Sequence, residues 1–243
     1  MKFSFVILTW NRYKFLEKCI PALLKSISGA HSYEVVIMDN GSTDETPQIL
    51  KEYKKNKNIR VITRSKNYGL NAYKRLFFHT RGEYVVIIDD DVLDFPANLD
   101  ALFLDYMTTF TDYGFIALNV IQNEFTDGAK PPIELYTEET KGDKVMEFGP
   151  AGGWCACFRK KDYRKILFKF LFAKVNMKVS EDGLLSFLFS KYLHLKYGLI
   201  KNSYCFHACG PYYAKQYGHL DREIEKYKIS GLEDHVEKYK KFE

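Results

Sequence analysis

Three consecutive aspartates end an apolar segment near the middle of the chain. The stretch Val85–Val92 reads VVIIDDDV, so four β-branched residues run directly into Asp89, Asp90 and Asp91. Adjacent carboxylates repel one another, and their pKa values rise unless a cation or hydrogen bonds offset the repulsion. Because side chains alternate along an extended strand, Asp89 and Asp91 should share one side, and Asp90 should point to the other. Two carboxylates in this spacing can share a divalent cation, or divide between a cation and a hydroxyl-bearing ligand.

Polar residues also follow two other apolar segments. The first segment ends at Thr9-Trp10-Asn11, and the second ends at Asp39-Asn40-Gly41. In open parallel α/β sheets, ligands bind beyond the carboxyl ends of the strands. We therefore expect these residues to meet Asp89 and Asp91 at one rim, where a divalent cation with oxygen ligands would neutralise the charge. Each aspartate taken alone could instead simply cap a turn, since Asp is common where strands end.

Two common nucleotide-binding motifs are missing from the sequence, and their absence narrows the class of ligand that such a cation would serve. No G-x-G-x-x-G follows a strand, and no G-x4-G-K-[ST] is present, so neither a dinucleotide site nor a P-loop is indicated. A Mg²⁺ or Mn²⁺ ion held by few carboxylates usually completes its shell with substrate phosphates and water. We expect a nucleoside diphosphate or triphosphate whose leaving group needs its charge neutralised.

Alternating strand and helix patterns must position these residues. Strands are expected at Phe3–Thr9, Glu34–Asp39, Ile59–Arg64 and Tyr84–Asp89. Helical patterns lie between them: apolar residues recur from Leu16 to Ile27, Pro47 opens a second helix, and Gly69–Thr80 forms a third. Strands that are separated by helices and apolar on both faces predict an α/β fold with a parallel sheet covered on both sides.

The second half of the chain has a less regular pattern. We expect helices at Leu99–Phe110 and Ser180–Leu193, and strands at Phe115–Ile121, Ala156–Arg159 and Leu199–His207. The polar stretch Asn123–Glu147 contains Pro131-Pro132 and predicts an excursion or a mobile loop. The charged segment His219–Phe242 predicts a helical tail.

Composition limits the class of protein and its partners. The chain has 243 residues, 46% of them apolar, and a net charge of +5. This modest excess permits an anionic substrate or membrane surface and does not indicate a nucleic-acid binder. A strand pattern begins at Phe3, and no apolar run approaches the roughly 18 residues that cross a bilayer. We expect a cytoplasmic protein. The tail, with Lys226, Lys228, Lys238, Lys240 and Lys241, would be either a solvated helix or a contact with the inner membrane face.

The five cysteines are Cys19, Cys155, Cys157, Cys205 and Cys209. The C-x-C and C-x3-C spacings match the usual C-x2-C zinc knuckle poorly. Buried, reduced thiols are therefore the favoured interpretation, and a structural zinc site is the alternative.

A second acidic motif, Ser180-Glu181-Asp182-Gly183, precedes the apolar sequence LLSFLF. Serine at the N-cap and acids in the first turn are ordinary helix-stabilising choices, worth about 1 kcal/mol. From spacing alone, this motif fits helix capping better than catalysis.

Taken in order, five motifs resemble glycosyltransferase family 2, which has the GT-A fold. They are FVILTWNR (Phe5–Arg12), VVIMDNGSTDET (Val35–Thr46), NYG (Asn67–Gly69), GEYVVIIDDD (Gly82–Asp91) and SEDG. The resemblance covers about Met1–His207 and implies a Rossmann-like, mostly parallel central sheet with helices on both faces. It divides a single domain, residues 1–243, into a sugar-nucleotide-binding half (1–122), an irregular acceptor-side half (123–210) and a charged helical tail (211–243).

The resemblance also implies roles for single residues. Asp182 would be the catalytic base, and Asp39 would bind the base of a sugar nucleotide. Asp89 and Asp91 would form a D-x-D pair, with Asp91 holding Mn²⁺ or Mg²⁺ on the diphosphate. His207 stands where some members place a further metal or diphosphate ligand, although a lone histidine on a strand is often structural. The other donor-binding residues would be Thr9, Asn11, Arg12, Asn67, Gly69, Asp90, Gly153 and Trp154.

The implied reaction is transfer of one sugar from a nucleoside-diphosphate sugar, most often a UDP-sugar, to a hydroxyl of a saccharide or lipid-linked saccharide. In-line attack assisted by a base predicts inversion at the anomeric carbon. No Q-x-x-R-W follows the SEDG motif, which argues against a processive synthase.

Two other classes stay open at this point. A sugar-nucleotide nucleotidyltransferase would normally place a Gly-rich, basic loop after the first strand, where this chain has WNRYKF. A noncatalytic sugar-nucleotide or glycan-binding module would not need both the D-x-D pair and Asp182.

Overall fold

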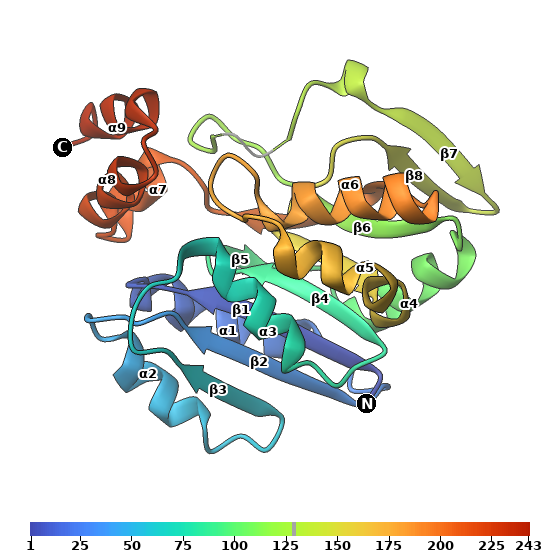
Figure 1. Ribbon diagram of the computed structural model, residues 1–243, viewed down its shortest axis with the longest axis horizontal. Coiled ribbons are helices and arrows are strands. Elements are labelled where there is room, and N and C mark those ends of the chain that lie inside the picture. The colour runs from blue at the N-terminus through green and yellow to red at the C-terminus, as the bar shows by residue number, and fades with distance from the viewer. Residues whose placement is uncertain (128–129) are drawn as a thin grey trace.

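One large mixed sheet runs through the molecule (Figure 1). The computed structural model describes residues 1–127 and 130–243. The strand order is β3-β2-β1-β4-β9-β6-β10-β8-β7, and the short strand β5 pairs with the end of β10. The strands are β1 (Phe3–Thr9), β2 (Tyr33–Asp39), β3 (Ile59–Thr63), β4 (Tyr84–Asp89), β5 (Val92–Asp94), β6 (Tyr113–Val120), β7 (Thr137–Lys141), β8 (Lys144–Phe148), β9 (Cys155–Arg159) and β10 (Lys196–His207).

The first four strands are parallel neighbours, as the alternation of strand and helix patterns predicts. In β1 and β4 nearly every residue is buried, which requires cover on both faces of the sheet. The register pairs Thr9 with Asp39 and Leu8 with Asp89. The ends of β1, β2 and β4 therefore lie at one rim, as expected from the sequence.

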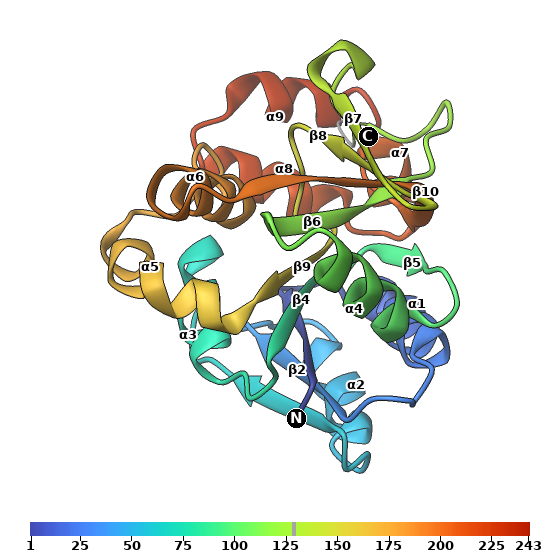
Figure 2. The ribbon, with the colours of Figure 1, turned by 90° about the vertical axis from the view of Figure 1, so that its right-hand side faces the viewer.

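Helices cover both faces of this sheet (Figure 2). In that view α3, α5 and α6 lie on one side, and α1, α2 and α4 lie on the other. The fold class expected from the sequence is confirmed. The helices are α1 (Tyr13–Ser26), α2 (Thr46–Tyr53), α3 (Ala72–Phe78), α4 (Leu99–Thr109), α5 (Lys160–Phe172), α6 (Glu181–Leu193), α7 (Pro211–Gln216), α8 (Leu220–Ile229) and α9 (Glu233–Lys240). The expected helix Gly69–Thr80 starts as a 3₁₀ turn, Gly69–Asn71, before α3.

Antiparallel strands extend the sheet in the second half of the chain. Strand β9 lies antiparallel between β4 and β6, and β10 runs parallel to β6. At its far end β10 pairs antiparallel with β5, so that His207 lies opposite Val92. Strand β5 was not expected from the sequence, because it is only three residues long and follows the aspartates directly.

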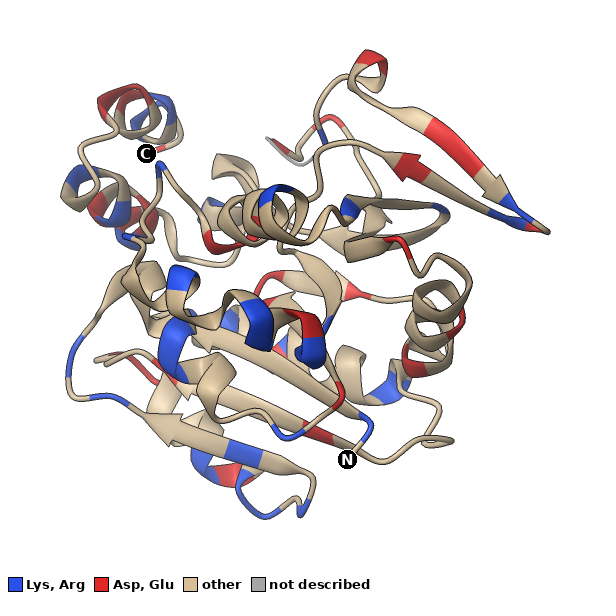
Figure 3. Cartoon of the chain, turned by 45° about the vertical axis from the view of Figure 1, so that its right-hand side comes forward, with Lys and Arg blue, Asp and Glu red and all other residues tan. Residues whose placement is uncertain are grey.

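The expectation of an excursion or mobile loop over Asn123–Glu147 is wrong for its second part. Residues 137–148 form the β7–β8 hairpin, which pairs with β10 and turns at Gly142 with φ +64°. The hairpin is acidic along its strands and basic at its turn (Figure 3). Its polar residues form ion pairs, such as that of Glu139 with Lys196 at 2.8 Å. A polar sequence can therefore form a strand here. Residues 128–129 of this stretch lie outside the described residues.

The C-terminal segment is helical, as expected, but it is broken into separate helices and is not simply solvated. Gly231, with φ +64°, separates α8 from α9. Their buried side chains form a small core of their own, made of Ala214, Leu220, Ile224, Tyr227, Val236 and Tyr239. Helices α7 to α9 lie beyond the carboxyl ends of β1 to β4 (Figure 1).

The cysteines are free thiols, and four of them are buried, in agreement with the favoured interpretation. Burial raises the pKa of Cys155, Cys157 and Cys205. Across residues 1–127 and 130–243, no helix is long and apolar enough to span a membrane.

Candidate active site

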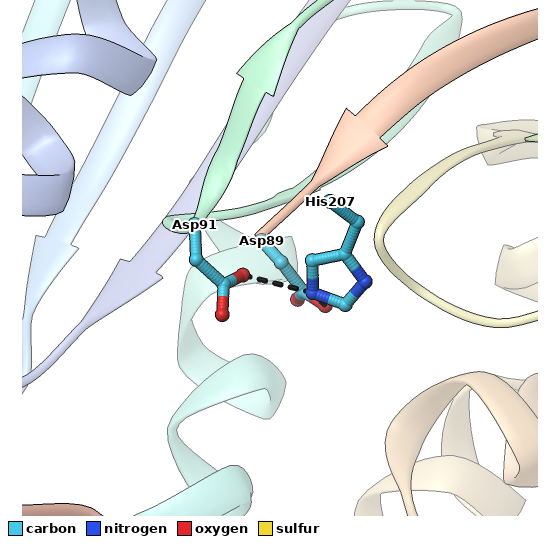
Figure 4. A group of neighbouring side chains, drawn as sticks. All are labelled: Asp89, Asp91 and His207. Carbon is cyan, nitrogen blue, oxygen red and sulfur yellow. Dashed lines mark ion pairs between the residues drawn. The ribbon is translucent and has the colours of Figure 1, made fainter. Parts of the chain in front are cut away.

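Three potential metal ligands converge where β4 and β10 end (Figure 4). One ligand atom from each of Asp89, Asp91 and His207 lies within 4.8 Å of the others. Pairing of His207 with Val92 brings the imidazole to the strand end, and the Ala208 N–H donates to the Asp91 carbonyl oxygen at 2.9 Å. Asp89 and Asp91 share this cluster and Asp90 is outside it, as expected, although Asp90 and Asp91 lie in the turn between β4 and β5 and not in a strand.

The cluster has an asymmetric charge distribution. His207 Nε2 lies 2.9 Å from Asp91 Oδ1 and 3.7 Å from Asp89 Oδ2. Burial, together with the charges of Asp91 and Asp90, raises the pKa of Asp89 to about 7 against the opposing effect of His207. Burial also acts to raise the pKa of Asp91, but Arg12 and His207 outweigh it and hold that pKa well below its usual range. The surroundings therefore favour the carboxylate form of Asp91 more than that of Asp89.

Arg12 supplies most of the compensating positive charge. Its guanidinium lies 3.1 Å from Asp90 Oδ1, 2.7 Å from Asp91 Oδ2 and 3.7 Å from Glu223 Oε1. It also stacks on Phe15, with 4.5 Å between Cζ and the ring centre. Burial acts to lower the pKa of Arg12, but the three carboxylates raise it well above its usual value. One buried arginine thus joins β1, the aspartate motif and α8.

The residues of the cluster fit a divalent cation. Asp91 Oδ1 is buried and, apart from its ion pair with His207, accepts no hydrogen bond from the described residues. Arg12 engages the other oxygen, Oδ2, so Oδ1 faces His207 alone, and an ion held there would replace that contact. Two carboxylates with one imidazole suit Mn²⁺ better than Mg²⁺, because Mg²⁺ prefers oxygen ligands and imidazole suits transition metals.

Asp182 lies in the first turn of α6 and is held by the backbone. Its Oδ2 accepts the Gly153 N–H at 2.7 Å, and its Oδ1 accepts the Gly183 N–H at 2.6 Å. A Cβ at position 153 would lie 3.2 Å from Glu181 Oε1, so a glycine allows this close approach. Neighbouring Glu181 is buried, and burial followed by the charges of Asp182 and Asp89 raises its pKa well above the usual value.

A hydrogen bond joins the two loops that follow β1 and β2. Asn11, with φ +51°, accepts the Thr43 N–H at 2.8 Å through Oδ1. Asp39 is buried, and its Oδ1 accepts the Ser42 N–H at 2.9 Å, which is the turn-capping alternative noted above. Gly41 has φ +81°, and a Cβ there would lie 2.5 Å from the backbone of Lys66. The NGS turn therefore requires its glycine.

A third loop joins this arrangement through Asn40. Its amide donates to Asn67 Oδ1 at 2.8 Å and to the Gly69 carbonyl at 3.2 Å, and its Oδ1 accepts the Tyr68 N–H at 3.1 Å. Asn40 thus fixes the NYG motif against the end of β2.

A cavity of about 1200 Å³ connects these elements. Most of the predicted site residues line it: Thr9, Arg12, Asn67, Gly69, Asp89, Asp90, Asp91, Asp182 and His207. Asn11, Asp39, Gly153 and Trp154 are not among its lining residues within the described chain. Gly153 contacts the cavity wall through Asp182, and Trp154 donates its indole N–H to the Leu118 carbonyl at 2.8 Å.

The C-terminal helices supply a wall of the cavity that the sequence did not indicate. Arg222, Glu223, Tyr227 and His235 line it. Arg222 Nε donates to the Trp10 carbonyl at 2.9 Å, and its guanidinium stacks on the Trp10 ring. No sequence signal could have placed Arg222 and Glu223, because Trp10 and Arg12 lie more than 200 positions away in the chain. Glu181 and Asn40 were also missed, although each is adjacent to a predicted residue.

Comparison with known proteins agrees with this geometry. The family model described as "Glycosyl transferase family 2" matches residues 4–167. The mixed α/β sheet with its covering helices has the GT-A arrangement. This chain belongs to glycosyl transferase family 2.

Sequence relatives match over limited regions. The poly(ribitol-phosphate) beta-N-acetylglucosaminyltransferase TarS of Staphylococcus aureus is 32% identical over 93 residues, covering 37% of this chain and 16% of that protein. A poly(ribitol-phosphate) beta-glucosyltransferase of Bacillus spizizenii is 33% identical over 94 residues, covering 37% and 15%. The matched region is thus about a sixth of the length of these relatives.

Solved structures share the fold over nearly the whole chain. S. aureus TarS 1–349 in complex with UDP-GlcNAc has a TM-score of 0.65 at 18% identity, covering 94% of this chain and 66% of that chain. The mannosyltransferase PcManGT of Pyrobaculum calidifontis, in complex with GDP-Man and Mn²⁺, has a TM-score of 0.65 at 16% identity, covering 98% and 62%.

Replacement of Arg12 tests whether it neutralises the buried acids. Arg12→Gln leaves Asp90, Asp91 and Glu223 without their shared cation, and breaking a buried pair costs about 3–5 kcal/mol. We expect the free energy of unfolding in urea to fall by about that amount. Arg164→Gln, on the exposed side of α5, should change it by no more than about 0.5 kcal/mol. A loss below about 1 kcal/mol for Arg12→Gln would show that the acids do not depend on Arg12.

Proposed function

We propose that this chain is an inverting, non-processive glycosyltransferase. It moves one sugar from a nucleoside-diphosphate sugar to a hydroxyl of a glycan or glycolipid, with Mn²⁺ or Mg²⁺ bound and Asp182 as general base. The observation that carries this proposal is the shared cavity, in which Asp182 and the cluster of Asp89, Asp91 and His207 face the same space. Membership of glycosyl transferase family 2 supports the reaction class.

A nucleotide sugar is the donor that fits this cavity. UDP is favoured as the nucleotide, since TarS, which shares the fold, has been crystallised with UDP and with UDP-GlcNAc. The loops at Asn11, Asp39 and Asn67, which are joined by hydrogen bonds, would form the nucleoside end of the site. Thr9 and Arg12 would lie beside the diphosphate, where the Arg12 guanidinium offsets the negative charge of Asp90 and Asp91.

Asp89, Asp91 and His207 would hold the metal ion on the donor diphosphate. When bound, the ion would stabilise the charge that develops on the departing nucleoside diphosphate. The complex of PcManGT with GDP-Man and Mn²⁺ is a precedent for such an ion in this fold. Asp89, whose side chain is 34% exposed, is also free to contact the ribose or the sugar.

Asp182 is suited to take a proton from the acceptor hydroxyl. The Gly153 and Gly183 N–H groups each occupy one lone pair of its carboxylate, so further lone pairs stay available. These two bonds fix the carboxylate, and fixed orientation is what proton transfer in a transition state requires. As the proton leaves, the acceptor oxygen attacks the anomeric carbon from the face opposite the diphosphate, and the configuration inverts.

Turnover with an Asp182 variant tests the assignment of the base. Purified protein with Mn²⁺ and a panel of UDP-, GDP- and dTDP-sugars should release the nucleoside diphosphate from at least one donor. Asp182→Asn should lower kcat about 100-fold or more, the usual contribution of a general base, with donor affinity unchanged. Asp234→Asn, an exposed acid on α9, is the matched control.

Two results would contradict this part of the proposal. Transfer that survives in Asp182→Asn would remove Asp182 as the base. Tight nucleotide binding without turnover of any donor would favour the noncatalytic binding module.

A variant of Asp91 tests the metal site through binding alone. In the wild type, Mn²⁺ should raise the affinity for the nucleoside diphosphate by about tenfold or more, since an ion held by the carboxylates would neutralise phosphate charge. In Asp91→Asn this gain should disappear. Asp94→Asn, at the exposed end of β5, should keep it. Isothermal titration with and without Mn²⁺ measures both, and an unchanged metal response in Asp91→Asn would remove Asp91 as a ligand.

A further inference from the structure

The outer side of α5 and α6 combines exposed aromatic rings with basic side chains. Phe168 and Phe172 on α5 are 73% and 87% exposed, and Phe187 and Tyr192 on α6 are 52% and 41% exposed. Large aromatic side chains are normally buried, so a group of them in water indicates an interaction site. The aromatic–basic face, as we define it, consists of these four residues with Lys161, Arg164, Lys165, Lys169 and Lys191.

Helical spacing places part of this face on one side of α5. Lys161, Lys165, Phe168 and Phe172 follow one another at intervals of four, three and four residues, which is the repeat of a single helix face. The opposite side of α5 is buried through Tyr163, Ile166 and Phe170.

Contacts between the two helices make the surface continuous. Helices α5 and α6 lie side by side in both views (Figures 1 and 2). Lys169 Nζ on α5 lies 4.0 Å from the centre of the Tyr192 ring on α6. Lys191 Nζ lies 5.1 Å from the centre of the Phe187 ring. Each of these rings therefore has a cation beside it.

The charge of this region is strongly one-sided. Residues 160–193 contain eight Lys and Arg against three Asp and Glu, a net charge of +5, which equals that of the whole chain. The acids do not reach the outer surface: Asp162 and Glu181 are buried, and Asp182 lines the cavity. Within the described residues, Lys161, Arg164, Lys169 and Lys191 have no ion-pair partner, whereas the other basic residue of the face, Lys165, pairs with Asp162 at 3.3 Å.

We propose that the aromatic–basic face binds the surface of an anionic lipid bilayer. Exposed phenylalanine rings would enter the boundary between headgroups and acyl chains. The long stems of the neighbouring lysines would let their ammonium groups reach the lipid phosphates. A second copy of this chain is a poor occupant, because a two-fold contact would bring the same positive charges together.

The C-terminal tail, residues 211–243, has no net charge, with seven Lys and Arg against seven Asp and Glu. Lys226 pairs with Glu223, and Lys238 pairs with Asp127. The apolar side chains of α8 and α9 pack into their own core. The aromatic–basic face is therefore the stronger membrane contact of the two.

The position of this face also matters for the cavity. Residues 174–178, which follow α5, line the cavity together with Asp182. A bilayer against α5 would hold the headgroup of a lipid-linked acceptor close to Asp182. This consequence rests on the proposed function, whereas the binding of lipid does not.

Vesicle co-sedimentation tests the proposal without any substrate. The full chain should bind vesicles of phosphatidylcholine with phosphatidylglycerol and should not bind phosphatidylcholine alone. Phe168→Ser/Phe172→Ser and Arg164→Glu/Lys169→Glu should each weaken binding by roughly tenfold or more, because they remove the inserted rings or reverse charges at the surface. Lys228→Glu/Lys241→Glu in the tail makes the same charge change and should leave binding within about twofold.

Three outcomes would overturn the proposal. They are absence of binding to anionic vesicles, equal binding by the wild type and both face variants, and loss of binding in the tail variant alone. Light scattering of the free protein provides a further check, since an oligomer that dissociates in Phe168→Ser/Phe172→Ser would make this face a contact between copies. All substituted side chains are exposed, and unchanged circular dichroism would confirm folding of each variant.

Discussion

The site depends on one buried arginine that balances three carboxylates. The residues that follow β4 lie at the rim of the sheet. Asp90 and Asp91 are nevertheless almost fully buried there. Arg12 approaches both, and Glu223 on α8 reaches the same guanidinium. Because an unpaired buried charge is very costly, the first loop, the aspartate motif and the C-terminal helices are stable only when packed together. Because Arg12 contacts Asp91 through Oδ2, Asp91 Oδ1 faces the His207 side of the cluster.

This arrangement explains how distant segments build one cavity. Parallel strands bring their ends to a single rim, which gathers Asp89, Asp91 and the loops after β1 and β2. The antiparallel pairing of β10 with β5 then adds His207, and Gly153 after the β8 strand orients Asp182. Neither half of the sheet contains a complete site, so glycosyl transfer would need both halves and the C-terminal helices in place.

Much of the fold follows from local patterns in the sequence. The strands around Phe3–Thr9 and Tyr84–Asp89 are apolar on both faces, and this requires a sheet covered by helices. The alternation of side chains separated Asp90 from Asp89 and Asp91, and the cluster has that division. The β7–β8 hairpin could not be predicted, since its polar residues are satisfied by distant partners such as Lys196. The packing of α8 against the loop after β1 could not be predicted for the same reason. Arg222 and Glu223 have the sequence pattern of surface residues, and their partners Trp10 and Arg12 lie far away in the chain.

Inversion requires that the departing diphosphate and Asp182 lie on opposite faces of the anomeric carbon. The most direct measurement is proton nuclear magnetic resonance of the sugar released to water from an α-linked UDP-sugar with Mn²⁺, followed before the anomers interconvert. The account predicts that the β-anomer appears first. Initial release of the α-anomer would contradict it, because retention requires a covalent intermediate or same-face attack that Asp182 as a base does not provide.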